Sequence, residues 1–302
     1  MELWHDRILV LDFGSQYTQL IARRIREAQV YSQILPCTVP LATVLAYRPK
    51  GIVLSGGPSS VYDKKAPSVS KQLFEQGIPI LGICYGMQLV THLQGGEVEK
   101  APHREFGRAE LTLDDRSDLF KGIGTRGSTV VWMSHGDRIE RMPPGFRSIA
   151  HTDNSPIAAM KRHDARQRIY CLQFHPEVAH TTEGATILKN FVYDICGCKP
   201  TWTMRSYVDT AVEQIRQQVG TERVICALSG GVDSSVAAAI THRAVGDQLT
   251  CIFVDNGVLR TGERDQVEKT FASQMHLNMR ILDRTSQFLT GLKSVTDPER
   301  KR

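Results

Sequence analysis

The chain has 302 residues, of which 41% are hydrophobic and 23% charged, so we expect two folded domains and exclude a disordered or coiled-coil protein. Its 37 basic and 32 acidic residues give a net charge of +5 without long blocks of like charge, which argues against nucleic-acid binding. An uncharged stretch from Ile78 to Gly96 contains Pro, His and Gln residues, and the N-terminus has Glu2 and Asp6 where a signal peptide would be basic. We therefore expect no membrane span, no secretory leader and a cytoplasmic protein.

Short apolar runs alternate with helical patterns in the first part of the chain. The periodicity predicts strands over 7–13, 51–55 and 79–83, and helices over 17–28, 68–76 and 85–93. Buried strands that alternate with helices indicate a mostly parallel sheet with helices on both faces. The short β-like runs over 106–174 predict a mixed or antiparallel extension of that sheet, and a helix over 183–196 completes an α/β domain.

A second α/β unit follows a Gly- and Pro-containing segment at 197–201, so we place the domains at 1–197 and 198–302. The pattern predicts a βαβαβ unit with strands over 223–229, 249–255 and 278–282 and helices over 233–245 and 263–275. The final DPERKR resembles the start of another helix. We expect this domain to be unfinished and to expose apolar surface.

Three glycines, Gly122, Gly124 and Gly127, match the dinucleotide-binding string G-x-G-x-x-G. A phosphate loop must leave a strand and open a helix, whereas here a strand-like run, TVVWM, follows the glycines. We interpret them as a turn.

Cys84 is the strongest candidate nucleophile in the first domain. It occupies a strand-to-helix corner between Gly82 and Gly86, where the helix N-terminus favours a thiolate. His175 and Glu177 follow another strand and provide a base and a carboxylate that can orient it. The alternatives are an inert buried cysteine, a satisfied strand-end histidine and a solvated loop acid.

The first domain contains three strings in order: LSGGPSS (54–60), GICYGMQ (82–88) and FHPE (174–177). On these strings it resembles the class I glutamine amidotransferases. The resemblance implies that Cys84 attacks the side-chain amide of glutamine, that His175 protonates the departing ammonia, and that Glu177 orients His175. It also places an oxyanion hole at the backbone amides of Gly57 and Tyr85, which suits a glycine loop and a helix N-terminus.

Two further parts of the chain match family positions that hold glutamine. The first is Gln88, one helical turn after Cys84, whose alternative is a helix-surface residue. The second is the SHGD stretch, whose alternative is an ordinary turn. Its residues are Ser134, His135, Gly136 and Asp137.

The second domain has a glycine- and serine-rich loop between a strand and an Ala-rich helix. Its residues are Ser229, Gly230, Gly231, Val232, Asp233, Ser234 and Ser235. Two glycines free the backbone to wrap an anion, the hydroxyls add donors at a helix N-terminus, and Asp233 suggests a Mg²⁺ ion with the phosphates. A simple N-cap would need no glycines. The loop resembles the PP-loop of ATP pyrophosphatases. Asp255, further along the chain, matches a family segment that lies beside the adenosine; the alternative for Asp255 is a strand-end cap. Cys196 and Cys198 lack a second ligand pair, so no side-chain metal cluster is predicted.

A glutamine amidotransferase domain followed by a PP-loop domain resembles the N-terminal part of the GMP synthases. That resemblance implies glutamine, ATP with Mg²⁺ and xanthosine monophosphate as ligands, and GMP as product. The family continues past the DPExKR motif into a C-terminal module that grips xanthylate and forms a homodimer. We expect that module to be missing here, so this chain alone would act as a glutaminase. Arg302 matches a xanthylate-binding arginine of the family.

Two alternatives stay open on sequence grounds. One is a stand-alone glutaminase, because the first domain is complete. The other is a non-catalytic regulator that responds to glutamine or ATP, against which the intact set of Cys84, His175 and Glu177 argues.

Overall fold

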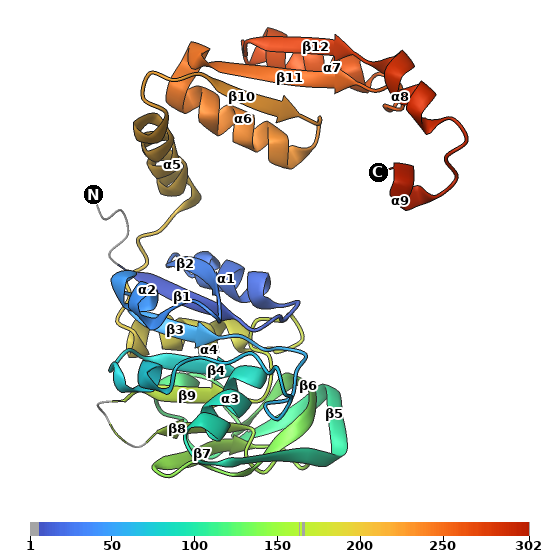
Figure 1. Cartoon of the computed structure of the whole chain (residues 1–302). Coiled ribbons are helices and arrows are strands. Elements are labelled where there is room, and N and C mark those ends of the chain that lie inside the picture. The colour runs from blue at the N-terminus through green and yellow to red at the C-terminus, as the bar shows by residue number, and fades with distance from the viewer. Residues whose placement is uncertain (1–5, 163, 165–166, 302) are drawn as a thin grey trace. The chain divides into compact units, whose positions relative to one another are not determined.

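The computed structural model describes residues 6–162, 164 and 167–301 of the chain. The chain divides into two compact units, Met1–Thr203 and Met204–Arg302, each described by itself (Figure 1). Arg302, the predicted xanthylate ligand, lies outside the described residues.

The first unit is built on one large sheet. Its elements are β1 (Arg7–Asp12), α1 (Thr18–Glu27), β2 (Tyr31–Pro36), α2 (Leu41–Ala46), β3 (Gly51–Leu54), a 3-10 helix (Lys71–Glu75), β4 (Ile80–Ile83), α3 (Tyr85–Leu93), β5 (Glu97–Leu113), a 3-10 helix (Asp118–Phe120), β6 (Ser128–Arg141), β7 (Phe146–His151), β8 (Ala159–Arg162), β9 (Ile169–Leu172), α4 (Gly184–Lys189) and a π-helix (Asn190–Ile195).

The nine strands have the order β2-β1-β3-β4-β9-β8-β7-β5-β6. The first five in this order pair in parallel, and the remaining four extend the sheet by antiparallel pairing. The predicted mixed, mostly parallel sheet with an antiparallel extension is therefore confirmed.

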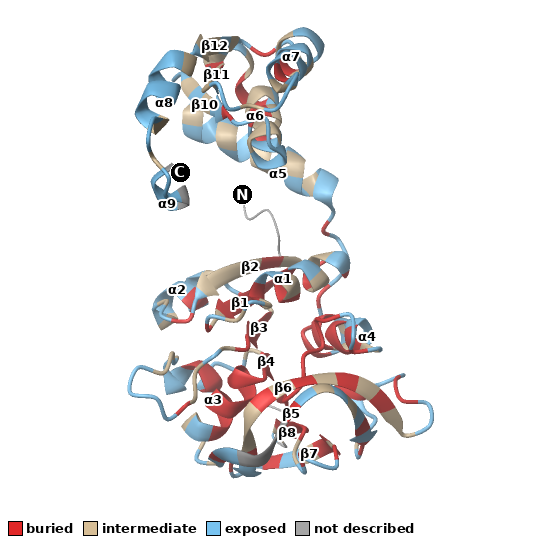
Figure 2. Ribbon diagram, turned by 90° about the vertical axis from the view of Figure 1, so that its right-hand side faces the viewer, coloured by how far each residue is buried: buried red, intermediate tan, exposed pale blue. Residues whose placement is uncertain are grey.

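Successive side chains of each central strand point to opposite faces of the sheet, and they form the hydrophobic cores on both faces. In β1, Ile8 and Val10 pack with the buried side of α1, whereas Leu9 and Leu11 pack with α3 on the other face. All four side chains are at most 1% exposed. Figure 2 shows buried residues concentrated in these central strands, so the strand ends that carry the site are held by a rigid scaffold.

Strand β2, helix α2 and the 3-10 helix Asp118–Phe120 were not predicted, and the helix predicted over 183–196 is α4 followed by a π-helix. Strand β2 and helix α2 are short, and β2 lies at the sheet edge with a mixture of buried and half-buried residues, so neither carries a clear period. The helix predicted over 68–76 is a 3-10 helix of five residues. Ser70 caps its start and Gly77, with φ +70°, ends it, which leaves too few residues for regular α-helical bonds.

The glycines of the G-x-G-x-x-G string form a turn, as predicted. Gly122, Gly124 and Gly127 have φ values of +78°, +58° and +90°, and β6 begins directly after them. The loop therefore leads into a strand and does not open a helix, as a dinucleotide-binding loop would.

The second unit contains a smaller sheet with helices. Its elements are α5 (Met204–Val219), β10 (Val224–Leu228), α6 (Val232–Val245), a 3-10 helix (Gly246–Gln248), β11 (Leu249–Asp255), α7 (Glu263–Glu268), a π-helix (Lys269–Gln274), β12 (Met279–Asp283), α8 (Thr285–Leu292) and α9 (Pro298–Lys301). The three strands are parallel in the order β10-β11-β12, which confirms the βαβαβ pattern.

One face of the smaller sheet packs on helices, and the other faces solvent. Leu228, Cys251 and Phe253 are buried in its core, whereas Ile225 is 72% exposed. The expectation that this domain would show apolar surface is therefore confirmed. In the described part of the chain, no helix is long and apolar enough to cross a membrane.

Candidate active site

A cavity of about 530 Å³ lies where the parallel strands of the first unit end. Four neighbouring strands, β1, β3, β4 and β9, each lead into a loop or helix that contributes to its wall, as expected for the carboxyl edge of an α/β sheet. The lining consists of residues 14–17, 57–60 and 134–137, with Cys84, Gln88, Phe106 and His175.

Cys84 is held in a sharp elbow between β4 and α3. Its backbone has φ 51° and ψ −106°, a conformation that non-glycine residues rarely adopt. A Cβ on Gly82 would stand 2.8 Å from the Gly86 carbonyl, and one on Gly86 would stand 2.4 Å from the Leu54 carbonyl oxygen. Both flanking glycines are therefore required by space, and together they place the thiol at the N-terminus of α3.

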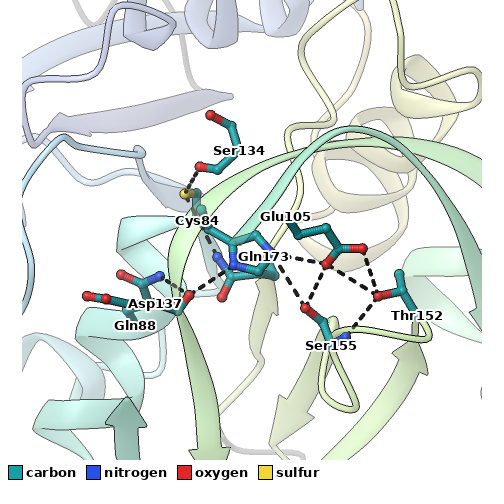
Figure 3. Close-up of polar contacts among 9 residues, drawn as sticks. Cys84, Gln88, Glu105, Ser134, Asp137, Thr152, Ser155 and Gln173 are labelled. Carbon is teal, nitrogen blue, oxygen red and sulfur yellow. Dashed lines mark hydrogen bonds and ion pairs between the residues drawn. The ribbon is translucent and has the colours of Figure 1, made fainter. Parts of the chain in front are cut away.

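The sulfur of Cys84 has two polar neighbours besides His175 (Figure 3). Its Sγ donates to the Ser134 carbonyl oxygen at 3.6 Å and accepts from Gln173 Nε2 at 3.9 Å. The Gln173 side chain is fully buried, and its Oε1 has no hydrogen-bond partner among the residues that the structure describes. Sequence reasoning did not select Gln173, although it directly precedes the FHPE string.

His175 and Glu177 form a buried pair. His175 Nδ1 lies 2.7 Å from Glu177 Oε1, and Glu177 is 0% exposed, so the solvated-acid alternative is wrong. Burial opposes the protonated form, but hydrogen bonds with Cys84 and Glu177 raise the pKa of His175 to about 10. The site therefore stabilises an imidazolium next to the Cys84 sulfur, as an activated thiol requires.

Several contacts fix the segment that carries this pair. Thr181 Oγ1 donates to the His175 carbonyl oxygen at 2.6 Å, and Arg24 Nε donates to the Glu177 carbonyl oxygen at 3.0 Å. The backbone of Gly184 approaches Pro176 so closely that a Cβ there would stand 1.9 Å from the Pro176 carbonyl oxygen. Arg24 could not be recognised from the sequence, because it lies 153 positions from Glu177, whereas Thr181 follows His175 by only six residues.

Of the two backbone positions expected to form an oxyanion hole, Gly57 lines the same cavity as Cys84, and Tyr85 follows Cys84 directly. A Cβ on Gly57 would stand 2.7 Å from the Phe13 carbonyl oxygen, so only glycine fits this loop. Tyr85 is the first residue of α3, where a backbone N–H has no acceptor within the helix. Both groups can therefore point at an anion without steric obstruction from a side chain at Gly57.

Gln88 and the SHGD stretch meet at the cavity wall. Gln88 is 4% exposed and its Nε2 donates to the Asp137 carbonyl oxygen at 3.1 Å, so the helix-surface alternative is wrong. Residues 134–137 lie within β6, so the ordinary-turn alternative is also wrong. His135 Nδ1 donates to the same Asp137 oxygen at 3.0 Å.

In the second unit, the loop 229–235 joins β10 to α6, and hydrogen bonds from its own serine hydroxyls stabilise it. Ser234 Oγ lies 3.0 Å from Ser229 Oγ, and Ser235 Oγ donates to the Gly231 carbonyl oxygen at 2.6 Å. Gly230 has φ +75°, which suits glycine at this position. A cavity of about 600 Å³ beside the loop is also lined by Arg260 and Glu263, which were not predicted.

Asp255 makes the contacts of a strand-end cap. Its Oδ1 accepts from the Gly257 backbone N–H at 3.0 Å, and its Oδ2 pairs with Arg264 at 3.3 Å. In the described part of the chain, no three His, Cys, Asp or Glu side chains are grouped as a metal site would require.

The missed lining residues at 14–17 had a signal in the sequence that could have selected them. Gly14 to Tyr17 follow β1, which corresponds to the strand predicted over 7–13. In the sheet, only β3 lies between β1 and β4, the strand that leads into Cys84. Tyr17 places its ring edge against His175, with ring centroids 5.2 Å apart. The rule that parallel strands end at a common edge could have selected this loop.

Comparison with known proteins agrees with this geometry. The sequence profile of the family Glutamine amidotransferase class-I matches residues 9–195, and that of NAD synthase matches residues 204–297. A solved structure from Thermoplasma acidophilum, described provisionally as part of a GMP synthase, superposes with a TM-score of 0.54 at 29% identity. It covers 64% of this chain and 94% of the Thermoplasma chain.

Two curated relatives, from Geobacillus kaustophilus and Carboxydothermus hydrogenoformans, are named GMP synthase [glutamine-hydrolyzing]. They are 54% and 52% identical to this chain over 297 residues, or 98% of it. The alignment covers 58% of each relative, so the chain spans little more than half of their length. With a family profile that matches most of its length, this chain belongs to the class I glutamine amidotransferase family.

Proposed function

We propose that this chain hydrolyses glutamine at Cys84, as the amide-donor part of a GMP synthase. The observation that carries the proposal is the meeting of the Cys84 elbow with the buried His175–Glu177 pair in one cavity. The two relatives named as glutamine-hydrolysing GMP synthases support the same reading.

In the first half of the reaction, the Cys84 thiolate attacks the carbonyl carbon of the glutamine side-chain amide. The new C–S bond leaves a negative charge on the amide oxygen, which the backbone N–H groups of Gly57 and Tyr85 would stabilise. Gln88 and the segment 134–137 would hold the glutamine during the attack.

The proton on His175 then goes to the amide nitrogen, and the C–N bond breaks to release ammonia and leave a thioester on Cys84. Water adds to the thioester while His175 takes one of its protons and returns it to the sulfur, which yields glutamate. Glu177 keeps the imidazole in the orientation and tautomer that both transfers need. Its buried carboxylate, 2.7 Å from Nδ1, suits this role.

The second unit would use ATP to adenylylate an oxygen of xanthosine monophosphate, with release of pyrophosphate. Ammonia would then displace this oxygen as AMP to give GMP. The loop 229–235 would cradle the phosphates of ATP with its backbone and hydroxyls. A Mg²⁺ ion, which neutralises charge on the phosphates, would be held near Asp233, in the first turn of α6. We place the complete protein in the cytoplasm as a homodimer in purine nucleotide biosynthesis.

The test is glutamate release from glutamine by the purified chain and two cysteine variants. Cys84→Ala removes the nucleophile, and we expect release to fall by at least about a thousandfold. Cys226→Ala removes a half-buried thiol in the second unit and should leave the rate unchanged. Release by Cys84→Ala within about tenfold of the parent rate would overturn the proposal.

A further inference from the structure

A buried polar cluster lies next to residues 134–137 of the cavity wall (Figure 3). Its residues come from strands β5 and β6 and from the loop after β7. It consists of Glu105, His135, Thr152 and Ser155, all between 2% and 8% exposed. Ser155 Oγ donates to Glu105 Oε2 at 2.9 Å, and Thr152 Oγ1 donates to Glu105 Oε1 at 3.1 Å. His135 Nε2 lies 3.3 Å from Glu105 Oε2. Of these four residues, only His135 belongs to a segment that the proposed chemistry at Cys84 uses.

The cluster is built around the carboxylate of Glu105. His135 Nδ1 faces the carbonyl oxygen of Asp137, and Nε2 faces the carboxylate of Glu105. The His135 ring therefore connects the Asp137 backbone to the Glu105 carboxylate. Burial opposes ionisation of Glu105, but hydrogen bonds from His135, Ser155 and Thr152 hold the pKa of Glu105 below its usual value. A buried charge with this many partners needs a reason beyond stability.

The pairing of β5 with β6 is irregular beside this cluster. Lys100 pairs with Asp137 and Glu105 pairs with His135, and the register of the two strands shifts between these pairs. The ladder between β5 and β6 is therefore irregular where β6 borders the cavity. At that point the Asp137 carbonyl oxygen accepts from both His135 Nδ1 and Gln88 Nε2. Side-chain bonds thus fix a segment that regular pairing leaves loose.

His135 is part of the cavity lining, but its side chain is almost completely buried. It is 1% exposed, and its ring nitrogens are used by Glu105 and Asp137. The part of the SHGD stretch left to meet a ligand is its backbone, which includes the Ser134 carbonyl that accepts from Cys84 Sγ.

We propose that Glu105, acting through His135, is a positioning residue for glutamine, and that the pair holds the backbone of residues 134–137 in the orientation that binds the substrate. The inference rests on the proposed glutaminase function of the same cavity. Ser155 and Thr152 support the carboxylate, much as second partners orient ligands in other sites.

The test compares steady-state glutamine hydrolysis by the parent, Glu105→Gln and Glu110→Gln. Glu105→Gln keeps shape and removes the charge, and we expect KM for glutamine to rise about tenfold while kcat changes less than about threefold. Glu110→Gln is the matched control, because Glu110 lies on the same strand, is exposed and accepts a hydrogen bond from Ser128 Oγ, away from the cavity lining. Its KM should equal that of the parent. Alkylation of Cys84 by iodoacetamide, which needs no glutamine site, should keep its rate within about twofold in Glu105→Gln.

The KM separates positioning from folding. A purely structural role would lower the folded fraction, and thus the apparent kcat, without changing KM. Should Glu105→Gln fail to fold, Ser155→Ala removes one bond to the carboxylate, and its KM should rise about threefold. An active parent with an unchanged KM in the variants would overturn this inference alone. A parent without glutaminase activity would overturn the proposed function, and this inference with it.

Discussion

The backbone of Gly86 lies against that of Leu54, so closely that a Cβ on Gly86 would stand 2.4 Å from the Leu54 carbonyl oxygen. This approach joins the first turn of α3 to the end of β3, and it fixes where the helix begins relative to the sheet. Because Cys84 stands at that start, the position of the thiol depends on a glycine two residues away.

Gly86→Ala should therefore displace the elbow. We expect a loss of about 1–3 kcal/mol in the free energy of unfolding of the first unit, and a fall in glutaminase kcat of about a hundredfold, because a small shift of a nucleophile has a large effect on rate. Urea unfolding and glutamate release measure both. Gly291→Ala is the control, since a Cβ there meets nothing within 4 Å. Unchanged activity in Gly86→Ala would show that the approach of Gly86 to Leu54 does not fix the position of the Cys84 thiol.

Cys84→Gly and Cys84→Ala should differ in stability. The φ of 51° at Cys84 strains a residue with a Cβ, and glycine relieves that strain. We expect Cys84→Gly to be more stable than Cys84→Ala by about 1 kcal/mol, with both variants inactive. Urea unfolding followed by tryptophan fluorescence reports on the first unit, because Trp132 and Trp202 belong to it and the sequence has no tryptophan after Trp202. Equal stability would show that the elbow is unstrained.

Glu177→Gln keeps the shape of the side chain but removes the charge that stabilises the imidazolium of His175. We expect kcat for glutamine to fall about tenfold to a hundredfold, with little change in KM and a smaller loss than in His175→Ala. Glu140→Gln, which alters an exposed ion pair with Arg138, should have no effect. A normal kcat in Glu177→Gln would remove the carboxylate from the mechanism.

The pH dependence of stability should report the same pair. The pKa of His175 is raised from 6.5 to about 10 in the folded state, because hydrogen bonds with Cys84 and Glu177 outweigh burial. The stabilisation is therefore fully present below about pH 6.5 and is lost as the pH rises through about 10.

We accordingly expect the difference in unfolding free energy between the parent and His175→Asn to shrink over that range, by up to about 1.4 kcal/mol per pH unit. Urea unfolding at several pH values, followed by tryptophan fluorescence, measures it. A difference that is constant between pH 6.5 and 10 would contradict the raised pKa.

The sequence allowed the main sheet, the second βαβαβ unit and the grouping of Cys84, His175 and Glu177 to be predicted. These features could be predicted because each depends on a short stretch of sequence, such as the period of a strand or the glycines on both sides of Cys84. The parallel order of strands then follows from the alternation of strands with helices.

The supporting contacts could not be predicted in the same way. Arg24 reaches the Glu177 carbonyl across 153 positions of sequence, and Glu105 meets Ser155 across 50. No local pattern encodes such pairs, because they depend on how the finished sheet brings distant loops together. Strand β2 was missed for a related reason, since its edge position leaves it without a clear apolar period.

The most direct test of the account is where a reactive glutamine analogue attaches. 6-Diazo-5-oxo-L-norleucine resembles glutamine and alkylates an activated nucleophile that lies within a glutamine site. After incubation of the whole chain, peptide mass spectrometry should find one adduct, on Cys84, and excess glutamine should slow its formation. An adduct on another of the seven cysteines, or labelling of Cys84 that glutamine does not slow, would contradict the assignment of this cavity as a glutaminase site.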